Sequence, residues 1–162
     1  MLKSYRFISL LFLLCISITG YSQHSLKWGK PSKEEIQLKV CSFDSTANAV
    51  VLAETGKLKF ISNYVYLDVY RKIKVLNSNG LLEYANIDIP YYTEKGLDAV
   101  QNLKTQTINY ENALPVITEL QKDLIFTKVL SPNRHEKKLV FSNVKPGSIL
   151  EYKYTLVSQN FL

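Results

Sequence analysis

The stretch YVYLDVYRKIKVL, residues 64–76, alternates apolar and polar side chains along almost its whole length. One side of an extended strand would carry Val65, Leu67, Val69, Ile73 and Val75, interrupted only by Arg71. The other side would carry Tyr64, Tyr66, Asp68, Tyr70, Lys72 and Lys74. A period of two residues predicts a half-buried strand with a wet, aromatic-rich outer face.

The polar side of this strand is the candidate interaction face of the chain. It consists of Tyr64, Tyr66, Tyr70, Lys72 and Lys74. Such side chains could bind a glycan, a peptide or another protein domain, and a partner domain fits them better than a small molecule. Aromatic residues are also frequent in strands simply because they pair with their neighbours. The sequence leaves the functional and the structural interpretation open.

Three turn signals around this strand predict hairpins. Asn-Gly within residues 77–80 predicts a turn into a return strand over 81–89. Glu111, Asn112 and Ala113 separate the strand-like segments 100–110 and 114–120, with Asn112 suited to a left-handed conformation. Pro146-Gly147 separates 137–144 from 148–157 and fits a type II turn. About seven short strands joined by such turns predict a mainly β fold, an antiparallel β-sandwich-like sheet with a short N-terminal helix.

Residues 23–48 form a lead-in before the β domain, which we place at 49–162. Ser32 and Glu35 have the spacing of a capping box and predict a short helix after Ser32. Ile36, Val40 and Phe43 would give that helix a narrow apolar stripe.

Residues 1–22 have the pattern of a secretory signal peptide. Lys3 and Arg6 precede an apolar run of 13 residues, and Gly20 and Ser22 suit a cleavage site before Gln23. The alternatives are an uncleaved anchor, although the run is short for a membrane span, and lipidation at Cys15. We expect an exported protein of the periplasm or outer envelope, in contact with the membrane only through this segment during export.

Catalytic chemistry has one candidate pair in this sequence, Cys41 and His135. A thiol nucleophile needs a base within hydrogen-bond reach. Cys41 follows the predicted helix, and His135 lies in the polar stretch SPNRHEKK, which predicts a loop. We interpret Cys41 as a small packing residue and His135 as a solvated loop side chain.

No cofactor or metal site is expected from the motifs. His24 and His135 have no partners at ligand spacing, and no glycine-rich loop suits a phosphate group. Asp44 is expected to accept a turn or cap hydrogen bond. The formal net charge is +6, but the basic residues are scattered, so a nucleic acid partner is not expected.

Several segments resemble one family, an exported bacterial domain of unknown function. The resemblance lies in DSTANAVVL at 44–52, Ile125-Phe126 and VKPGSILEYKYTL at 144–156, within matching stretches over about residues 26–160. That domain precedes transglutaminase-like cores in Gram-negative envelope proteins. The resemblance implies a non-catalytic domain that packs against or positions such a core, or that binds an envelope protein or glycan. The catalytic Cys, His and Asp of the core would lie downstream.

Two features differ from the family pattern. Ala113 stands where the family has the glycine of an Asn-Gly turn, which would cost about 1 kcal/mol if both turn residues take positive φ. The family domain also continues beyond Ser158, so the chain is expected to be the front portion of a longer protein or the product of a truncated gene. On that basis we expect the strand 148–157 to be an exposed edge that promotes aggregation.

Overall fold

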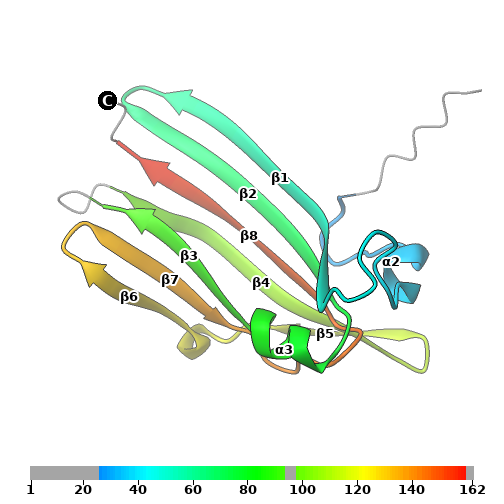
Figure 1. The fold of residues 1–162 in the computed structure, drawn as a ribbon. Coiled ribbons are helices and arrows are strands. Elements are labelled where there is room, and N and C mark those ends of the chain that lie inside the picture. Colours follow the sequence, from blue (N-terminus) through cyan, green and yellow to red (C-terminus); the bar gives the residue numbers. More distant parts are fainter. Residues whose placement is uncertain (1–25, 94–97, 160–162) are drawn as a thin grey trace, which may run out of the picture.

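The computed structural model describes residues 26–93 and 98–159, which form two antiparallel sheets (Figure 1). Sheet A has the strand order β1-β2-β8-β4-β5 and sheet B the order β3-β7-β6. The strands are β1 (Ala49–Ile61), β2 (Tyr64–Val75), β3 (Asn86–Tyr92), β4 (Ala99–Glu111), β5 (Leu114–Glu119), β6 (Ile125–Ser131), β7 (Arg134–Val140) and β8 (Ile149–Ser158). The predicted mainly β, sandwich-like fold is confirmed. The proposed signal peptide, Cys15 and His24 lie outside the described residues.

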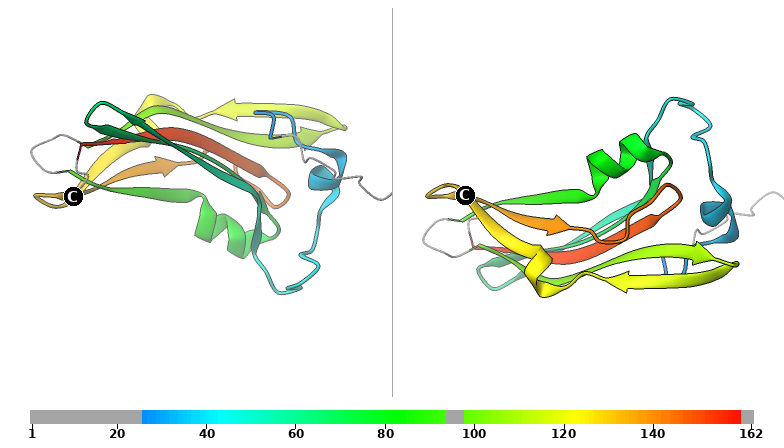
Figure 2. Two further views of the ribbon diagram at one scale, coloured as in Figure 1. Left: turned by 90° about the horizontal axis from the view of Figure 1, so that it is seen from above. Right: turned by 90° about the horizontal axis from the view of Figure 1, so that it is seen from below.

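The hydrophobic core lies between the two sheets (Figure 2). Sheet A contributes Ile73 and Val75 from β2 and Leu150 and Tyr152 from β8. Sheet B contributes Ile89 and Leu139, and Phe141 follows directly after β7. The apolar side of the opening stretch therefore faces sheet B, as its alternation predicted. The polar side of β2 lies on the opposite surface of sheet A, which we call the outer face.

The predicted helix is α2 (Lys33–Gln37), and its capping box is present. The Glu35 amide donates to Ser32 Oγ over 3.2 Å, and the Ser32 amide donates to the Glu35 carboxylate over 2.7 Å. The predicted apolar stripe is wrong, because Glu35 is the buried residue of this helix. Val40 and Phe43 are 55% and 88% exposed, since α2 ends at Gln37, before either residue.

The predicted hairpin at Asn79-Gly80 is also wrong. Asn77 caps a helix instead, α3 (Ser78–Tyr84), by accepting hydrogen bonds from the amides of Asn79 and Gly80. Gly80 is needed for space, because a Cβ there would lie 2.1 Å from the backbone oxygen of Asn48. The return strand begins only at Asn86, as β3, and pairs with β7 in the other sheet.

The second hairpin is confirmed as β4 and β5. Asn112 and Ala113 both have positive φ, 50° and 64°, which matches a primed two-residue turn. The alanine therefore occupies a conformation that favours glycine.

The third predicted hairpin is wrong, although its turn forms. Gly147 has φ 92° and the Ser148 amide donates to Lys145 O, but β7 belongs to sheet B and β8 to sheet A. The chain crosses between the sheets at residues 141–148. Side chains of β4 hold this corner, since Thr107 donates to Ser142 O and Asn109 donates to Asn143 O.

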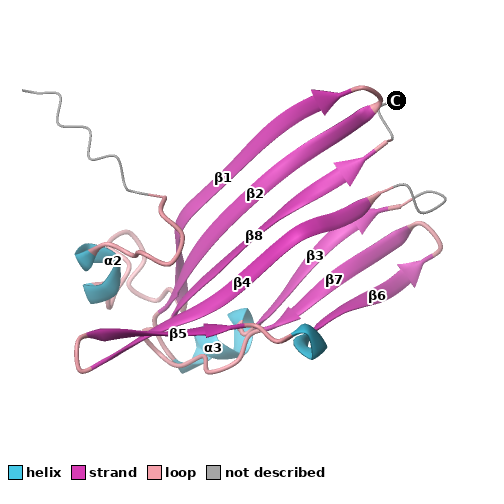
Figure 3. Cartoon of the chain, turned by 180° about the vertical axis from the view of Figure 1, so that it is seen from behind, coloured by secondary structure: helices cyan, strands magenta, loops and turns pink. Residues whose placement is uncertain are grey.

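Strand β8 is the centre of sheet A and not an edge (Figure 3). It pairs with β2 from Val65 to Lys74 and with β4 on its other side. The expected exposed edge at 148–157 is therefore wrong, and the aggregation inferred from it loses its structural basis. The polar stretch around His135 is corrected as well, because Arg134–Val140 is strand β7, in a hairpin with β6.

Candidate interaction site

The outer face of sheet A has two halves. One half, around Lys72, Lys74 and Glu151, lies beneath the lead-in residues 26–48; we call it the covered half. The other half, around Asp68, Tyr70 and Thr155, forms a groove; we call it the open half. The halves share β2, β8 and β4, so the same alternating strands supply both.

A buried ionic cluster forms the covered half. Lys72 is 1% exposed, Glu35 5% and Glu151 0%. Lys72 Nζ lies 3.1 Å from both oxygens of Glu35 and 3.8 Å from Glu151. Charges survive such burial only when they are paired and hydrogen-bonded, so this cluster ties α2 to the sheet.

Glu151 accepts three further hydrogen bonds. Its donors are Tyr70 Oη at 2.8 Å, Gln106 Nε2 at 2.6 Å and the Gly29 amide at 2.8 Å. Burial raises the pKa of Tyr70 well above its usual range, and the bond to Glu151 adds to this. The Gly29 bond anchors the lead-in at a second point.

Lys74 completes the covered half. Its ammonium group donates to the backbone oxygens of Ile36 at 3.0 Å and Gly147 at 2.7 Å. Burial lowers the pKa of Lys74, while the charge of Glu35 opposes that shift. The lysine therefore joins the lead-in to the Pro-Gly turn.

The residues of the predicted interaction face lie only in part at the surface. Lys72 and Lys74 are buried beneath the chain's own lead-in and cannot meet a partner in this fold. Tyr70 is half-buried with its hydroxyl held by Glu151. Tyr64 and Tyr66 remain partly exposed, their rings 6.3 Å apart. Sequence alternation identified the polar side, but it carries no information on a covering segment in which Glu35 lies 37 residues before Lys72.

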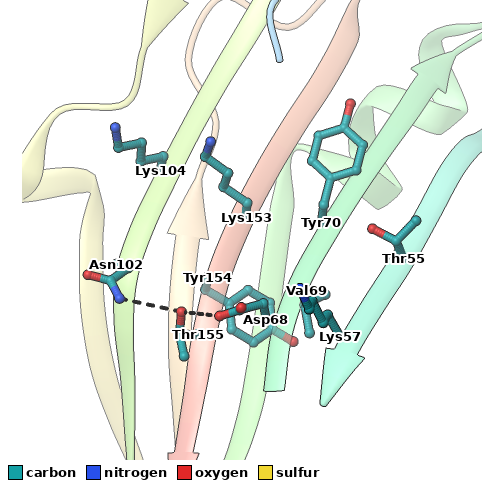
Figure 4. Close-up of a pocket in the computed structure, with 10 residues that line it drawn as sticks. All are labelled: Thr55, Lys57, Asp68, Val69, Tyr70, Asn102, Lys104, Lys153, Tyr154 and Thr155. Atoms are coloured by element: carbon teal, nitrogen blue, oxygen red, sulfur yellow. Dashed lines mark hydrogen bonds between the residues drawn. The ribbon is translucent and has the colours of Figure 1, made fainter. Parts of the chain in front are cut away.

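The open half is a groove of about 450 Å³ across four strands (Figure 4). One row crosses it in register, from Thr55 on β1 through Tyr70 and Lys153 to Lys104 on β4. The next row contains Lys57, Asp68 and Thr155. Glu151, Lys153 and Lys104 were not among the predicted site residues. The sequence could have identified Glu151 and Lys153 from the polar side of β8. Lys104 joins them only once β2 and β4 are known to flank β8.

A hydrogen-bond chain crosses the floor of the groove (Figure 4). Asn102 Nδ2 donates to Thr155 Oγ1 at 3.4 Å, and Thr155 donates to Asp68 at 2.8 Å. Asn102 lies in an irregularity of β4 between Gln101 and Lys104 and has φ 53°. Such bulges redirect side chains, and here the redirected amide points at Thr155.

The groove is rich in positive charge. Lys57, Lys104 and Lys153 line it, and the one carboxylate, Asp68, is already bonded to Lys59 and Thr155. These hydrogen bonds lower the pKa of Asp68, and the bond from Lys59 contributes most. The Lys153 ammonium lies 4.8 Å from the centre of the Trp28 ring, so a lead-in residue positions it.

The candidate catalytic residues lie on different elements. Cys41 is buried after α2, whereas His135 lies in β7 with its ring 5.6 Å from that of Tyr91. No hydrogen bond joins the two side chains in the described part of the chain. Within residues 26–93 and 98–159, no three His, Cys, Asp or Glu side chains gather as a metal site. Asp44 accepts from the Thr46 amide and hydroxyl, as expected of a turn.

No helix among the described residues has the length and apolar character to cross a membrane. This result concerns α2 and α3 and does not bear on residues 1–25.

The fold and the groove together define a two-layered antiparallel β domain whose outer face is half covered by its own lead-in. Residues 65–162 match the family described as "Domain of Unknown Function with solved-structure structure (DUF3857)". The chain belongs to this DUF3857 family.

One solved structure resembles the chain, a crystal structure of a "putative protease" from Parabacteroides distasonis ATCC 8503. The TM-score is 0.57 at 9% sequence identity, so the likeness is one of fold. The match covers 68% of this chain and 23% of that protein, which is therefore much longer than the matched region. No curated protein matches the chain.

Proposed function

We propose that this chain is a non-catalytic domain that packs against and positions a transglutaminase-like catalytic domain. The observation that supports this most is coverage, since a similar fold occupies only 23% of a longer protein that is named a "putative protease". The family resemblance of the segments 44–52 and 144–156 points to the same arrangement.

The sheet edges offer surfaces for such packing. Large apolar side chains are exposed on β1, β5 and β6: Val51, Leu58, Ile61, Leu114, Val116, Ile117, Phe126, Val129 and Leu130. Exposed apolar edges of this kind favour contact with another polypeptide. We assign the docking surface to β1, because it is a 13-residue edge strand of sheet A.

The test begins with the DNA that surrounds the gene. We expect it to encode, in frame or next to this chain, a domain with a Cys, His and Asp core. The two domains, purified separately, should form a one-to-one complex by isothermal titration calorimetry. Leu58→Glu on β1 should weaken the complex, whereas Leu82→Glu on α3, at another exposed leucine, should not. Absence of such a coding region, or no complex, would overturn the proposal.

We place the chain in the periplasm or outer envelope, with residues 1–22 removed as a signal peptide. The pattern of Lys3, Arg6 and the apolar run supports this location. Mass spectrometry of the protein from a periplasmic fraction should give an N-terminus at Gln23. A protein that retains Met1, or that stays in the cytoplasm, would contradict it.

A second candidate function is a glycan- or peptide-binding module that uses the outer face of sheet A. The lysine-lined groove favours it, although the face is displaced from the predicted one toward β8 and β4. The alternative of a Cys41–His135 hydrolase is tested by Cys41→Ala, which we expect to leave any measured hydrolysis or acyl transfer unchanged. Loss of such an activity in this variant would restore the enzyme hypothesis.

A further inference from the structure

The covered half shows how the outer face of sheet A binds a polypeptide segment, here the chain's own lead-in. The lead-in places the acidic side chain of Glu35 on Lys72, and its Gly29 amide bonds to Glu151. A carboxylate from an added segment thus pairs with an ammonium group on the face. The groove begins one row further along the same strands, at Tyr70 and Lys153.

In the groove, Lys104 and Lys153 repeat the cationic half of that arrangement, while the carboxylate of the lining, Asp68, lies opposite Lys57 and is bonded to Lys59 and Thr155. Lys104 and Lys153 lie directly opposite each other across β4 and β8. Like charges at such positions repel and destabilise the pair. Among the described residues, no carboxylate forms a salt bridge with Lys104 or Lys153, so these two facing ammonium groups remain available to an anion.

The groove is also held in place before any ligand arrives. Trp28 lies beneath the Lys153 ammonium, and Glu151 fixes the hydroxyl of Tyr70. The chain Asn102–Thr155–Asp68 holds the floor. A preformed site loses less conformational entropy when it binds.

We propose that the groove binds an extended acidic peptide segment of a partner polypeptide, whose carboxylates pair with Lys104 and Lys153. The inference rests on the second candidate function, binding by the outer face, and names its ligand. A peptide is favoured over an anionic glycan because the adjacent half of the same face already holds a peptide through a glutamate. Tyr70 would contact the backbone or a side chain of the bound segment at the boundary between the halves.

The test uses a fluorescein-labelled peptide of 12 residues that alternates glutamate and serine, and measures its fluorescence anisotropy. A peptide with glutamine in place of glutamate is the ligand control. The variant Lys104→Gln/Lys153→Gln removes the two groove charges. Lys122→Gln/Lys128→Gln, at exposed positions beside and on sheet B, removes the same net charge elsewhere. Circular dichroism melting checks that both variants fold.

We expect the groove variant to lose about tenfold in affinity, the control variant to retain it, and the glutamine peptide not to bind. Binding should weaken strongly in 0.5 M salt, where the Debye length is only about 4 Å. Equal loss in both variants, or equal binding of the glutamine peptide, would overturn the inference.

A polygalacturonate fragment, an anionic glycan, distinguishes the proposal of a peptide ligand from the broader proposal of a binding module on the outer face. Binding of this fragment through Lys104 and Lys153, with no binding of the acidic peptide, would refute the peptide ligand and keep the binding module. No binding of either probe would refute both. Neither result bears on the docking of β1.

Discussion

The two halves of the outer face contrast sharply although one strand runs through both. Asp68 and Tyr70 line an open groove, whereas Lys72 and Lys74, two and four residues beyond Tyr70, are almost fully buried. The same continuous strand, β2, supplies these residues on both sides of the boundary. The difference comes from the lead-in, which supplies Glu35 to the covered half but reaches only the boundary of the groove, where Trp28 contacts Tyr70 and Lys153. A polar strand face can thus be a buried ionic layer or a binding surface, depending on a segment remote in sequence.

The largest effect is expected in the covered half, for Lys72→Met. The substitution leaves Glu35 and Glu151 buried without their lysine, which should cost about 3–5 kcal/mol of unfolding free energy. Urea denaturation followed by circular dichroism measures it. A loss below about 1 kcal/mol would show that water reaches this half and would remove the contrast.

Tyr70→Phe at the boundary should cost less, about 1.5–3 kcal/mol, because one hydrogen bond to a buried carboxylate is lost. The same unfolding experiment applies.

The variant should also change the pH dependence. Because the folded pKa of Tyr70 is raised, its stabilising contribution is present below about pH 10, where unfolded tyrosine is protonated, and is lost at higher pH. Stability should therefore fall above pH 10 in the unsubstituted chain and fall less steeply in Tyr70→Phe. Parallel curves would mean that Tyr70 ionises alike in both states.

Ala113→Gly should stabilise the hairpin that extends the covered half by about 1 kcal/mol, since Ala113 has φ 64°. Ala53→Gly within β1 is the matched control and should destabilise by about 0.5–1 kcal/mol. Thermal melting compares the two. A destabilising Ala113→Gly would indicate that the alanine methyl group makes a contact worth more than the strain.

The smallest effect is expected in the open half, for Lys104→Met. Removing one of two facing lysines should raise stability by at most about 0.5 kcal/mol. This value, set against that of Lys72→Met on the same face, measures the contrast between the halves. A loss above about 1 kcal/mol would show that Lys104 supports the fold and is no free ligand for an anion.

Local sequence patterns correctly predicted the caps and turns that form between residues close together in the chain. The capping box of Ser32 and Glu35, the turn at Asn112-Ala113 and the positive φ of Gly147 are confirmed. Each of these features depends on interactions between residues a few positions apart, so the local sequence is enough to predict it.

Partner choice between distant segments could not be predicted. The dipeptide Asn79-Gly80 is typical of a hairpin turn, but here the glycine is required by the close approach of Asn48. The Pro146-Gly147 turn was correct, yet it joins two sheets because Thr107 and Asn109 of β4 hold the corner. The candidate site shifted for the same reason, since burial of Lys72 and Lys74 is decided by Glu35 and the backbone of Ile36.

The central place of β8 has a consequence for biosynthesis. Among the described strands it is the last to leave the ribosome, and both its neighbours, β2 and β4, are made long before it. Until β8 inserts, each of them has an unsatisfied hydrogen-bonding edge that can capture another nascent chain. Sheet A cannot form strand by strand in chain order. Folding must await the long-range insertion of β8 and should be slow for a domain of this size. The segment that completes the sheet is thus also the one that sets how long the growing polypeptide needs protection.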